Sequence, residues 1–241
     1  MLIVALEPFD AFERASEVES IVMDGLRRKY YRFRYSRHYG GIVTADAVGC
    51  NILCAYCWNF SRNQNPEKVG VYRSPAEVAD ELLKISRKKK ADLFRVSGAE
   101  PILGRRSMGH LVDVIKRVDS PFILETNGLL LGRMPDLAEM LKGLDITVRV
   151  AIKGWDEKSF ERITGADGSG FRYQLIALKE LTERCIAVWP AIMIDVFGDE
   201  GARLIREQVA EIGLEVEMEE LNRYPFVMDN LRKRGVEVKT G

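Results

Sequence analysis

Three of the four cysteines in this 241-residue chain lie within eight consecutive positions, and no other pattern in the sequence points so directly to chemistry. Cys50, Cys54 and Cys57 form the spacing CxxxCxxC inside the stretch 49–58. Three thiolates at this spacing can surround one face of a cubane when the segment is an irregular loop, whereas on a helix they would form a stripe. Such a tripod leaves one iron of a [4Fe–4S] cluster without a protein ligand. The spacing therefore predicts an iron–sulfur cluster with one iron open to a reactant.

A disulfide and a zinc site are the simpler interpretations of the same cysteines. A disulfide is not expected, because the first residues carry no basic region ahead of their apolar run and do not form a secretory signal. Zinc would normally take a fourth Cys or His at related spacing, and His38 and His110 are both remote in sequence. Cys185 alone is too little for a second cluster, and we expect it to be a buried structural residue at the start of a strand.

The composition is that of an ordinary globular domain. Apolar residues make up 46% of the chain and charged residues 30%, and no apolar run approaches the ~20 residues that span a bilayer. We therefore expect a single domain in the cytoplasm, with reduced thiols. Lys plus Arg and Asp plus Glu both number 36, so the global charge does not indicate a nucleic-acid or membrane partner.

The elements that must position the cysteines alternate regularly between strands and helices. The segment 76–89 is predicted to be helical, because Ser74 and Pro75 supply an N-cap and a first helical residue. Such alternation predicts a parallel sheet with right-handed crossovers. The expected fold is α/β, a partial, open (β/α)6 TIM-like barrel with its site at the carboxyl ends of the strands. The predicted strands are 41–48, 92–97, 121–126, 145–152, 186–194 and 214–218, and the further predicted helices are 108–117, 135–142, 171–184 and 200–212.

Residues 1–40 are predicted to form an N-terminal extension, helical and basic, ahead of a single barrel domain of residues 41–241. Apolar residues at helical spacing predict a helix over 16–28. The stretch 27–37 interleaves cations with aromatics, as surfaces that bind RNA do. The alternative is an ordinary basic surface element whose aromatics pack on the domain. The sequence leaves both interpretations open.

The cysteine motif resembles the signature of the radical S-adenosylmethionine (SAM) superfamily, in which an aromatic residue precedes the last Cys, as Tyr56 does here. The resemblance extends from about residue 41 to about residue 220. It implies that SAM binds the open iron and that an external one-electron reductant, of flavodoxin or ferredoxin type, drives the cleavage of SAM. The product expected in this superfamily is a 5′-deoxyadenosyl radical, which abstracts a hydrogen atom from a substrate.

The ends of the later predicted strands resemble the SAM-binding segments of the same superfamily. The sequence SGAEP at 97–101 is similar to the GGEP motif, in which the Glu would accept hydrogen bonds from the SAM ammonium. Polar groups after the next strand would bind the ribose, and an apolar residue of the fifth strand would contact the adenine. The resemblance implies a SAM site formed by Tyr56, Gly98, Glu100, Thr126, Asn127, Lys153 and Ile192.

Within the superfamily the chain is most similar to the pyruvate-formate-lyase-activating enzymes, whose protein substrate is a glycyl-radical enzyme. The sequence ETNG at 125–128 matches a motif of that group, whereas Ala151 stands where those enzymes have an acidic residue. The basic stretch 27–37 and Trp58, directly after the third Cys, favour modification of RNA or a nucleoside instead. A metal-cluster binding module without SAM chemistry is the non-enzymatic alternative. The substrate is not identified by the sequence.

Overall fold

One nine-stranded sheet forms the centre of the computed structural model, which describes residues 7–238. The first six residues of the predicted extension and the last three of the predicted barrel domain lie outside the described residues. The strand order is β1-β2-β3-β5-β6-β7-β8-β9, with β4 paired to β2. Neighbouring strands from β3 to β9 pair in parallel, and each of these six strands overlaps a predicted strand. They are β3 (Ile42–Ala47), β5 (Phe94–Ser97), β6 (Phe122–Thr126), β7 (Ile146–Ala151), β8 (Val188–Met193) and β9 (Glu217–Glu219).

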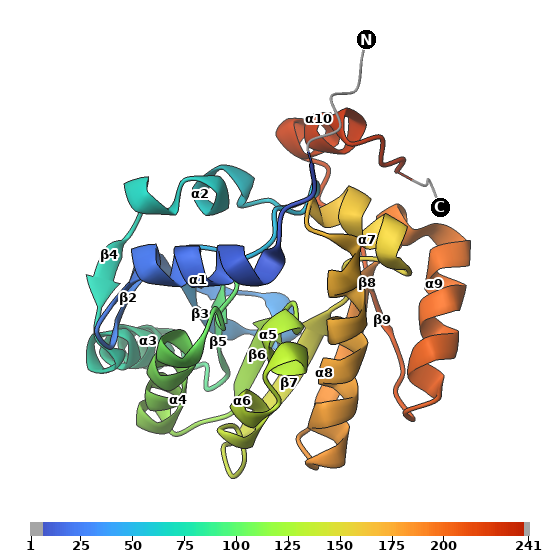
Figure 1. Ribbon diagram of the computed structural model, residues 1–241. Helices are drawn as coiled ribbons and strands as arrows, with labels where there is room; N and C mark the ends of the chain where they lie inside the picture. Colours follow the sequence, from blue (N-terminus) through green and yellow to red (C-terminus); the bar gives the residue numbers. More distant parts are fainter. Residues whose placement is uncertain (1–6, 239–241) are drawn as a thin grey trace.

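Helices connect these strands and cover one face of the sheet, with α3, α4, α5 and α8 lying in front of it in Figure 1. The predicted start of α3 is confirmed, because Ser74 and Glu77 form a capping box there. No helix within residues 7–238 is both long and apolar enough to cross a bilayer. The helices after β3 are α2 (Phe60–Gln64), α3 (Pro75–Lys89), α4 (Arg105–Val118), α5 (Leu129–Arg133), α6 (Asp136–Glu139), α7 (Glu157–Thr164), α8 (Phe171–Glu183), α9 (Ile194–Ala210) and α10 (Pro225–Lys233).

The parallel strands are apolar on one face and charged on the other. Val96, Leu124 and Val148 are fully buried members of the hydrophobic core. Arg95 and Arg149, one residue away along β5 and β7, line an open cavity instead. This difference follows from the alternation of side chains along a strand. The fold therefore places charged groups on the face of the sheet opposite to its core.

The N-terminal segment joins the sheet, and its helix is shorter than predicted. α1 (Ala11–Val22) ends six residues before the predicted end at 28, and the chain turns through β1 (Met23–Asp24) and Gly25, at φ +58°. The stretch that follows is β2 (Arg27–Ser36), which pairs antiparallel with β3 and also with the short β4 (Val71–Arg73). The helix prediction over 23–28 was wrong, because the pairing of β1 with β2 and of β2 with β4 outweighs a weak helical pattern.

Most cations of the basic stretch have partners inside the protein. Lys29 Nζ donates to two backbone carbonyls of η2 (Pro66–Lys68), both at 3.1 Å. Arg32 and Arg34 form ion pairs with Asp46 of β3, at 2.6 and 2.7 Å. These contacts favour the structural interpretation of residues 27–37, and binding of RNA to this stretch stays a prediction.

Cys185 is exposed, so the expectation of a buried residue was wrong. It lies just beyond the end of α8 in the left-handed region, at φ +57°. Strand β8 begins three residues later, at Val188, so Cys185 belongs to the surface turn rather than to the strand.

The buried His110 connects α4 to the N-terminal segment. Its Nδ1 lies 2.7 Å from the carbonyl oxygen of Leu26, and its Nε2 lies 3.0 Å from the hydroxyl of Tyr30. Burial lowers the pKa of His110 to about 4, so the folded protein keeps this ring neutral.

We expect the free energy of unfolding to fall as the pH drops from about 6.5, the ordinary pKa of histidine, towards 4, because only the unfolded chain binds the proton in this window. The contribution of His110 amounts to about 3 kcal/mol across the window. Urea unfolding at a series of pH values should show a flatter dependence for His110→Gln than for the wild type. His38→Gln, at the exposed histidine, is the control, and an unchanged slope in His110→Gln would contradict the assignment.

Candidate active site

A cavity of about 640 Å³ lies at the carboxyl ends of the parallel strands, and the three motif cysteines line it. They stand on the irregular loop between β3 and α2, as their spacing predicted. Met193 lines the cavity, whereas the predicted adenine contact Ile192 does not and is buried on the other face of β8. The structure brings six predicted SAM-site residues to the same cavity: Tyr56, Gly98, Glu100, Thr126, Asn127 and Lys153.

The cysteine loop is held from both sides by segments remote in sequence. The backbone N–H groups of Leu53 and Ala55 donate to the carbonyls of Thr164 and Ile163 at the end of α7, at 3.0 and 2.8 Å. On the other side, Nε of Arg14 in α1 donates to the Cys50 carbonyl at 3.2 Å. The loop geometry therefore depends on two helices as well as on its own sequence.

The three thiols line one cavity and are the type of donor that iron–sulfur clusters bind. Burial raises the pKa of Cys50 to about 12 and the pKa values of Cys54 and Cys57 to about 11. Binding of a metal deprotonates its thiol ligands and so opposes this effect of burial. Asn63 Nδ2 lies 3.8 Å from Cys57 Sγ and donates towards it, and hydrogen bonds to sulfur are one means of stabilising a cluster. Asn63 was missed from the sequence, where nothing distinguishes it from other loop amides.

The turn after β5 requires a glycine. Gly98 has φ +82°, and a Cβ there would meet the Tyr31 hydroxyl at 3.2 Å and the Ala47 carbonyl at 3.3 Å. Its own carbonyl accepts from Nδ2 of Asn59 at 2.5 Å and from Nδ2 of Asn63 at 3.0 Å. The same Asn63 amide therefore connects the cysteine loop to the predicted SAM motif.

The carboxylate of Glu100 ties the ends of β5 and β6 together. One oxygen accepts from the N–H of Ile102 at 3.1 Å and from the hydroxyl of Thr126 at 2.6 Å, and the other accepts from the N–H of Asn127 at 2.7 Å. The residue is 3% exposed, and burial raises its pKa to about 7. Three of about four lone-pair positions are thus occupied by protein donors, and one remains for a ligand.

Arg28 of β2 supports this turn from behind. Its guanidinium is 1% exposed and donates to the carbonyls of Glu100 and Pro101, at 2.6 and 2.7 Å. Burial lowers the pKa of Arg28, and Tyr30, two carboxylates and the Cys50 thiol oppose that shift. A residue of the N-terminal segment therefore orients the predicted SAM motif. The sequence did not reveal this role, because Arg28 precedes its two partners by 72 and 73 residues.

Lys153 lines the cavity on the side of β6 and β7, and the fully buried Gln174 of α8 holds the ends of these strands. Gln174 Nε2 donates to the Asn127 carbonyl at 2.6 Å, and its Oε1 accepts from the Lys153 N–H at 2.9 Å. Lys153 Nζ lies 5.2 Å from the centre of the Tyr56 ring. Burial alone would lower the pKa of Lys153, but Tyr56, Cys54 and Glu219 raise it, so this ammonium stays charged beside the cysteine loop.

Ion pairs cover the rest of the cavity wall. Arg95 Nη1 donates to Glu125 at 2.6 Å, and the hydroxyl of Tyr39 donates to the same carboxylate oxygen at 3.0 Å. Arg149 pairs with Glu217 at 2.7 Å and with Glu219 at 2.8 Å. A charged residue inside an apolar parallel strand was the sequence signal for Arg95 and Arg149, because such strands are normally apolar throughout.

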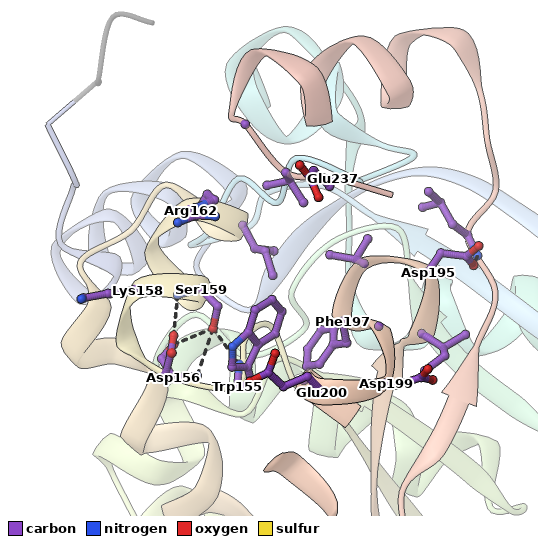
Figure 2. Close-up of a pocket in the computed structure, with 18 of the residues that line it drawn as sticks. Trp155, Asp156, Lys158, Ser159, Arg162, Asp195, Phe197, Asp199, Glu200 and Glu237 are labelled. Carbon is purple, nitrogen blue, oxygen red and sulfur yellow. Dashed lines mark hydrogen bonds between the residues drawn. The ribbon is translucent and has the colours of Figure 1, made fainter. Parts of the chain in front are cut away.

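A second, larger cavity of about 1220 Å³ lies between α7, α9 and residues 235–237 and contains none of the cysteines (Figure 2). Trp155 and Phe197 meet edge to face in it, with ring centres 5.4 Å apart. The hydrogen bonds drawn between Asp156 and Ser159 are the N-terminal cap of α7. Asp195 accepts from the N–H of Leu221 at 2.7 Å. These polar groups are used within the fold, so the cysteine cavity is the candidate active site.

Comparisons with known proteins agree on one family. The model of the Radical SAM superfamily matches residues 46–207. A probable GTP 3′,8-cyclase from Thermoplasma volcanium is 30% identical over 135 residues, which cover 54% of this chain and 39% of the cyclase. The FeMo cofactor biosynthesis protein NifB of Frankia alni is 27% identical over 206 residues, which cover 76% of this chain and 40% of NifB.

The solved structure of Streptococcus suis SuiB bound to S-adenosylmethionine has the same fold. It superposes with a TM-score of 0.60 at 13% identity, covering 80% of this chain and 48% of SuiB. The chain thus spans about half of SuiB, and 39% and 40% of the two curated relatives.

We expect Cys50→Ala, Cys54→Ala and Cys57→Ala each to abolish stable iron binding, because a three-thiolate tripod has no spare protein ligand. Iron and sulfide content after anaerobic reconstitution is the measurement. Cys185→Ala, at the exposed cysteine, is the matched control and should keep its iron. Equal loss of iron in Cys185→Ala would contradict the ligand assignment.

Glu100→Gln should weaken SAM binding while the iron content is kept, because a charge-assisted hydrogen bond contributes about 1.5–3 kcal/mol, or roughly ten- to hundredfold in the dissociation constant. Glutamine is preferable to alanine, which would leave three buried donors without an acceptor. Calorimetry of SAM binding to the reconstituted protein is the measurement. An unchanged affinity for SAM would contradict the predicted contact and leave Glu100 only its structural role of joining the ends of β5 and β6.

Proposed function

We propose, from the membership of the chain in the radical SAM superfamily, that it cleaves SAM reductively and thereby starts hydrogen abstraction from a small molecule. Members of this superfamily use a [4Fe–4S] cluster and SAM. The observation that carries the proposal is the convergence of three thiols and six predicted SAM-site residues on one cavity. When bound, the cluster supplies the electron that breaks a carbon–sulfur bond of SAM. The residues of the chain bind, orient and shield the reactants.

Each part of the cavity wall has a role in this proposal. Cys50, Cys54 and Cys57 would hold the cluster, and the remaining lone pair of Glu100 would accept from the SAM ammonium. Thr126 and Asn127 hold that carboxylate in place through hydrogen bonds of 2.6 and 2.7 Å. A flavodoxin- or ferredoxin-type protein would deliver the electron.

The type of substrate follows from the relatives and from the cavity. The two curated relatives are named as a probable GTP cyclase and a cofactor biosynthesis protein, and they favour a small-molecule substrate over the glycyl-radical enzyme of an activase. Ala151 lines the cavity at the position where activases have an acidic residue, which also argues against activase chemistry. Cyclisation of GTP itself is not proposed, because the chain spans only 39% of that relative.

The proposal is tested by the product formed without substrate. We expect dithionite and SAM to give slow formation of 5′-deoxyadenosine and methionine by the reconstituted protein, because an empty substrate site leaves SAM imperfectly oriented and partly wet. Chromatography of the quenched reaction is the measurement, and Cys54→Ala should give neither product. Release of methylthioadenosine, or no cleavage by protein with full iron and bound SAM, would refute the proposed reaction.

A further inference from the structure

We propose that Arg32 and Arg34 of β2 form the binding site for an anionic group of the small-molecule substrate, a phosphate or a carboxylate. The inference rests on the proposed function, because it names the substrate chemistry of the same cavity. Both arginines line that cavity together with the three cysteines. Neither residue belongs to the motifs of the SAM site.

One buried carboxylate serves both guanidinium groups. Asp46 is fully buried and accepts from Arg32 Nε at 2.6 Å and from Nε and Nη2 of Arg34 at 2.7 and 3.1 Å. Two positive charges therefore share a single negative charge, and one positive charge remains uncompensated at this end of the cavity. The carboxylate also fixes both guanidinium groups before a ligand arrives, which lowers the entropy cost of binding.

The aromatic neighbours of Arg32 hold it at the wall. Its guanidinium carbon lies 5.6 Å from the ring centre of Tyr31 and 6.0 Å from that of Trp58. The ion pair with Asp46 engages Nε, and 47% of the side chain stays exposed. A guanidinium that is fixed through Nε and lies beside two aromatic rings suits bidentate recognition of a phosphate or carboxylate.

The other charges of the cavity direct the anion to β2. Arg95 is paired with Glu125, so this pair contributes no net charge. At the far wall Arg149 is flanked by Glu217 and Glu219. Lys153 and Glu220 also line the cavity there, so three carboxylates face two cations and one negative charge is in excess near β9. The cavity is therefore positive at β2 and negative at β9, and an anionic group is attracted to the first and repelled from the second.

A small molecule fits this position better than a nucleic acid. The two arginines lie in the wall of a cavity of about 640 Å³, which also contains the cluster ligands and the predicted SAM residues. A polynucleotide would use the exposed cations of the stretch, such as Arg27 and Arg37, which do not line the cavity. The location of the uncompensated charge thus favours a ligand that enters the cavity.

Equilibrium dialysis of the reconstituted, SAM-loaded protein tests the proposal, with radiolabelled pyrophosphate and citrate as probes of phosphate and carboxylate. We expect the wild type to bind at least one probe at submillimolar concentration, and Arg32→Gln to weaken that binding at least tenfold. The probe that binds identifies the anionic group. Arg27→Gln is the matched control, because Arg27 is an exposed, ion-paired arginine of the same strand.

Absence of binding by both probes, or equal weakening in Arg27→Gln and Arg32→Gln, would overturn the proposal. A single-stranded RNA that displaces the probe is a further outcome. If the binding of this RNA depends on Arg27 as much as on Arg32, the proposal is overturned in favour of a nucleic-acid surface. If Arg32→Gln lost its iron, Arg32→Lys would test the same contact. We expect Arg32→Lys to bind the probe more weakly than the wild type does, because an ammonium cannot replace the two-pronged guanidinium. Probe binding is measured without reductant, and SAM cleavage is measured without probe, so a failure of the proposed function is distinguishable from a failure of this inference.

Discussion

A carboxylate that has been removed from water fixes the geometry of the site. Glu100 must find hydrogen-bond donors, because an unsatisfied buried carboxylate is costly. It finds them on β6 and in its own turn, so the ends of two parallel strands cannot move apart without breaking these bonds. Arg28 donates to the carbonyls of the same turn, and Gln174 connects the end of β6 to the end of β7. The positions of the cysteine loop and of the remaining cavity wall depend on this cross-connection.

The charged residues on the cavity face of the sheet reduce the stability of the fold in favour of a binding site. Arg95 and Arg149 are almost fully buried, and removing such charges from water is offset only when their partners are well placed. Apolar residues at both positions would pack without that cost. Arg95 and Arg149 line the same cavity as the cysteines. Two charged residues at this place are understandable if the cavity must hold a polar reactant.

The sequence predicted those features that depend on short-range patterns. Five of the six parallel strands were readable as short, mainly apolar runs, and the cysteine loop was readable from three cysteines within eight residues. The role of Arg28 was not, because its partners lie 72 and 73 residues later. The first residues of β2 looked helical for a related reason, since their pairing with β1 and with the distant β4 outweighs local propensity. At β8, a shift of one residue separates Ile192 from the cavity-lining Met193, and no apolar pattern distinguishes two neighbouring apolar side chains.

The two backbone hydrogen bonds between the cysteine loop and α7 also bear on when the site can form. Leu53 and Ala55 bind carbonyls of residues that are synthesised about 110 positions later. While the ribosome is still making the strands in between, the thiols are already outside the exit tunnel but their loop lacks half of its support. The finished shape of the loop must await the synthesis of α7. Insertion of a metal cluster into that shape is consequently a late event in the life of the new chain, and the nascent thiols need protection from oxidation until then.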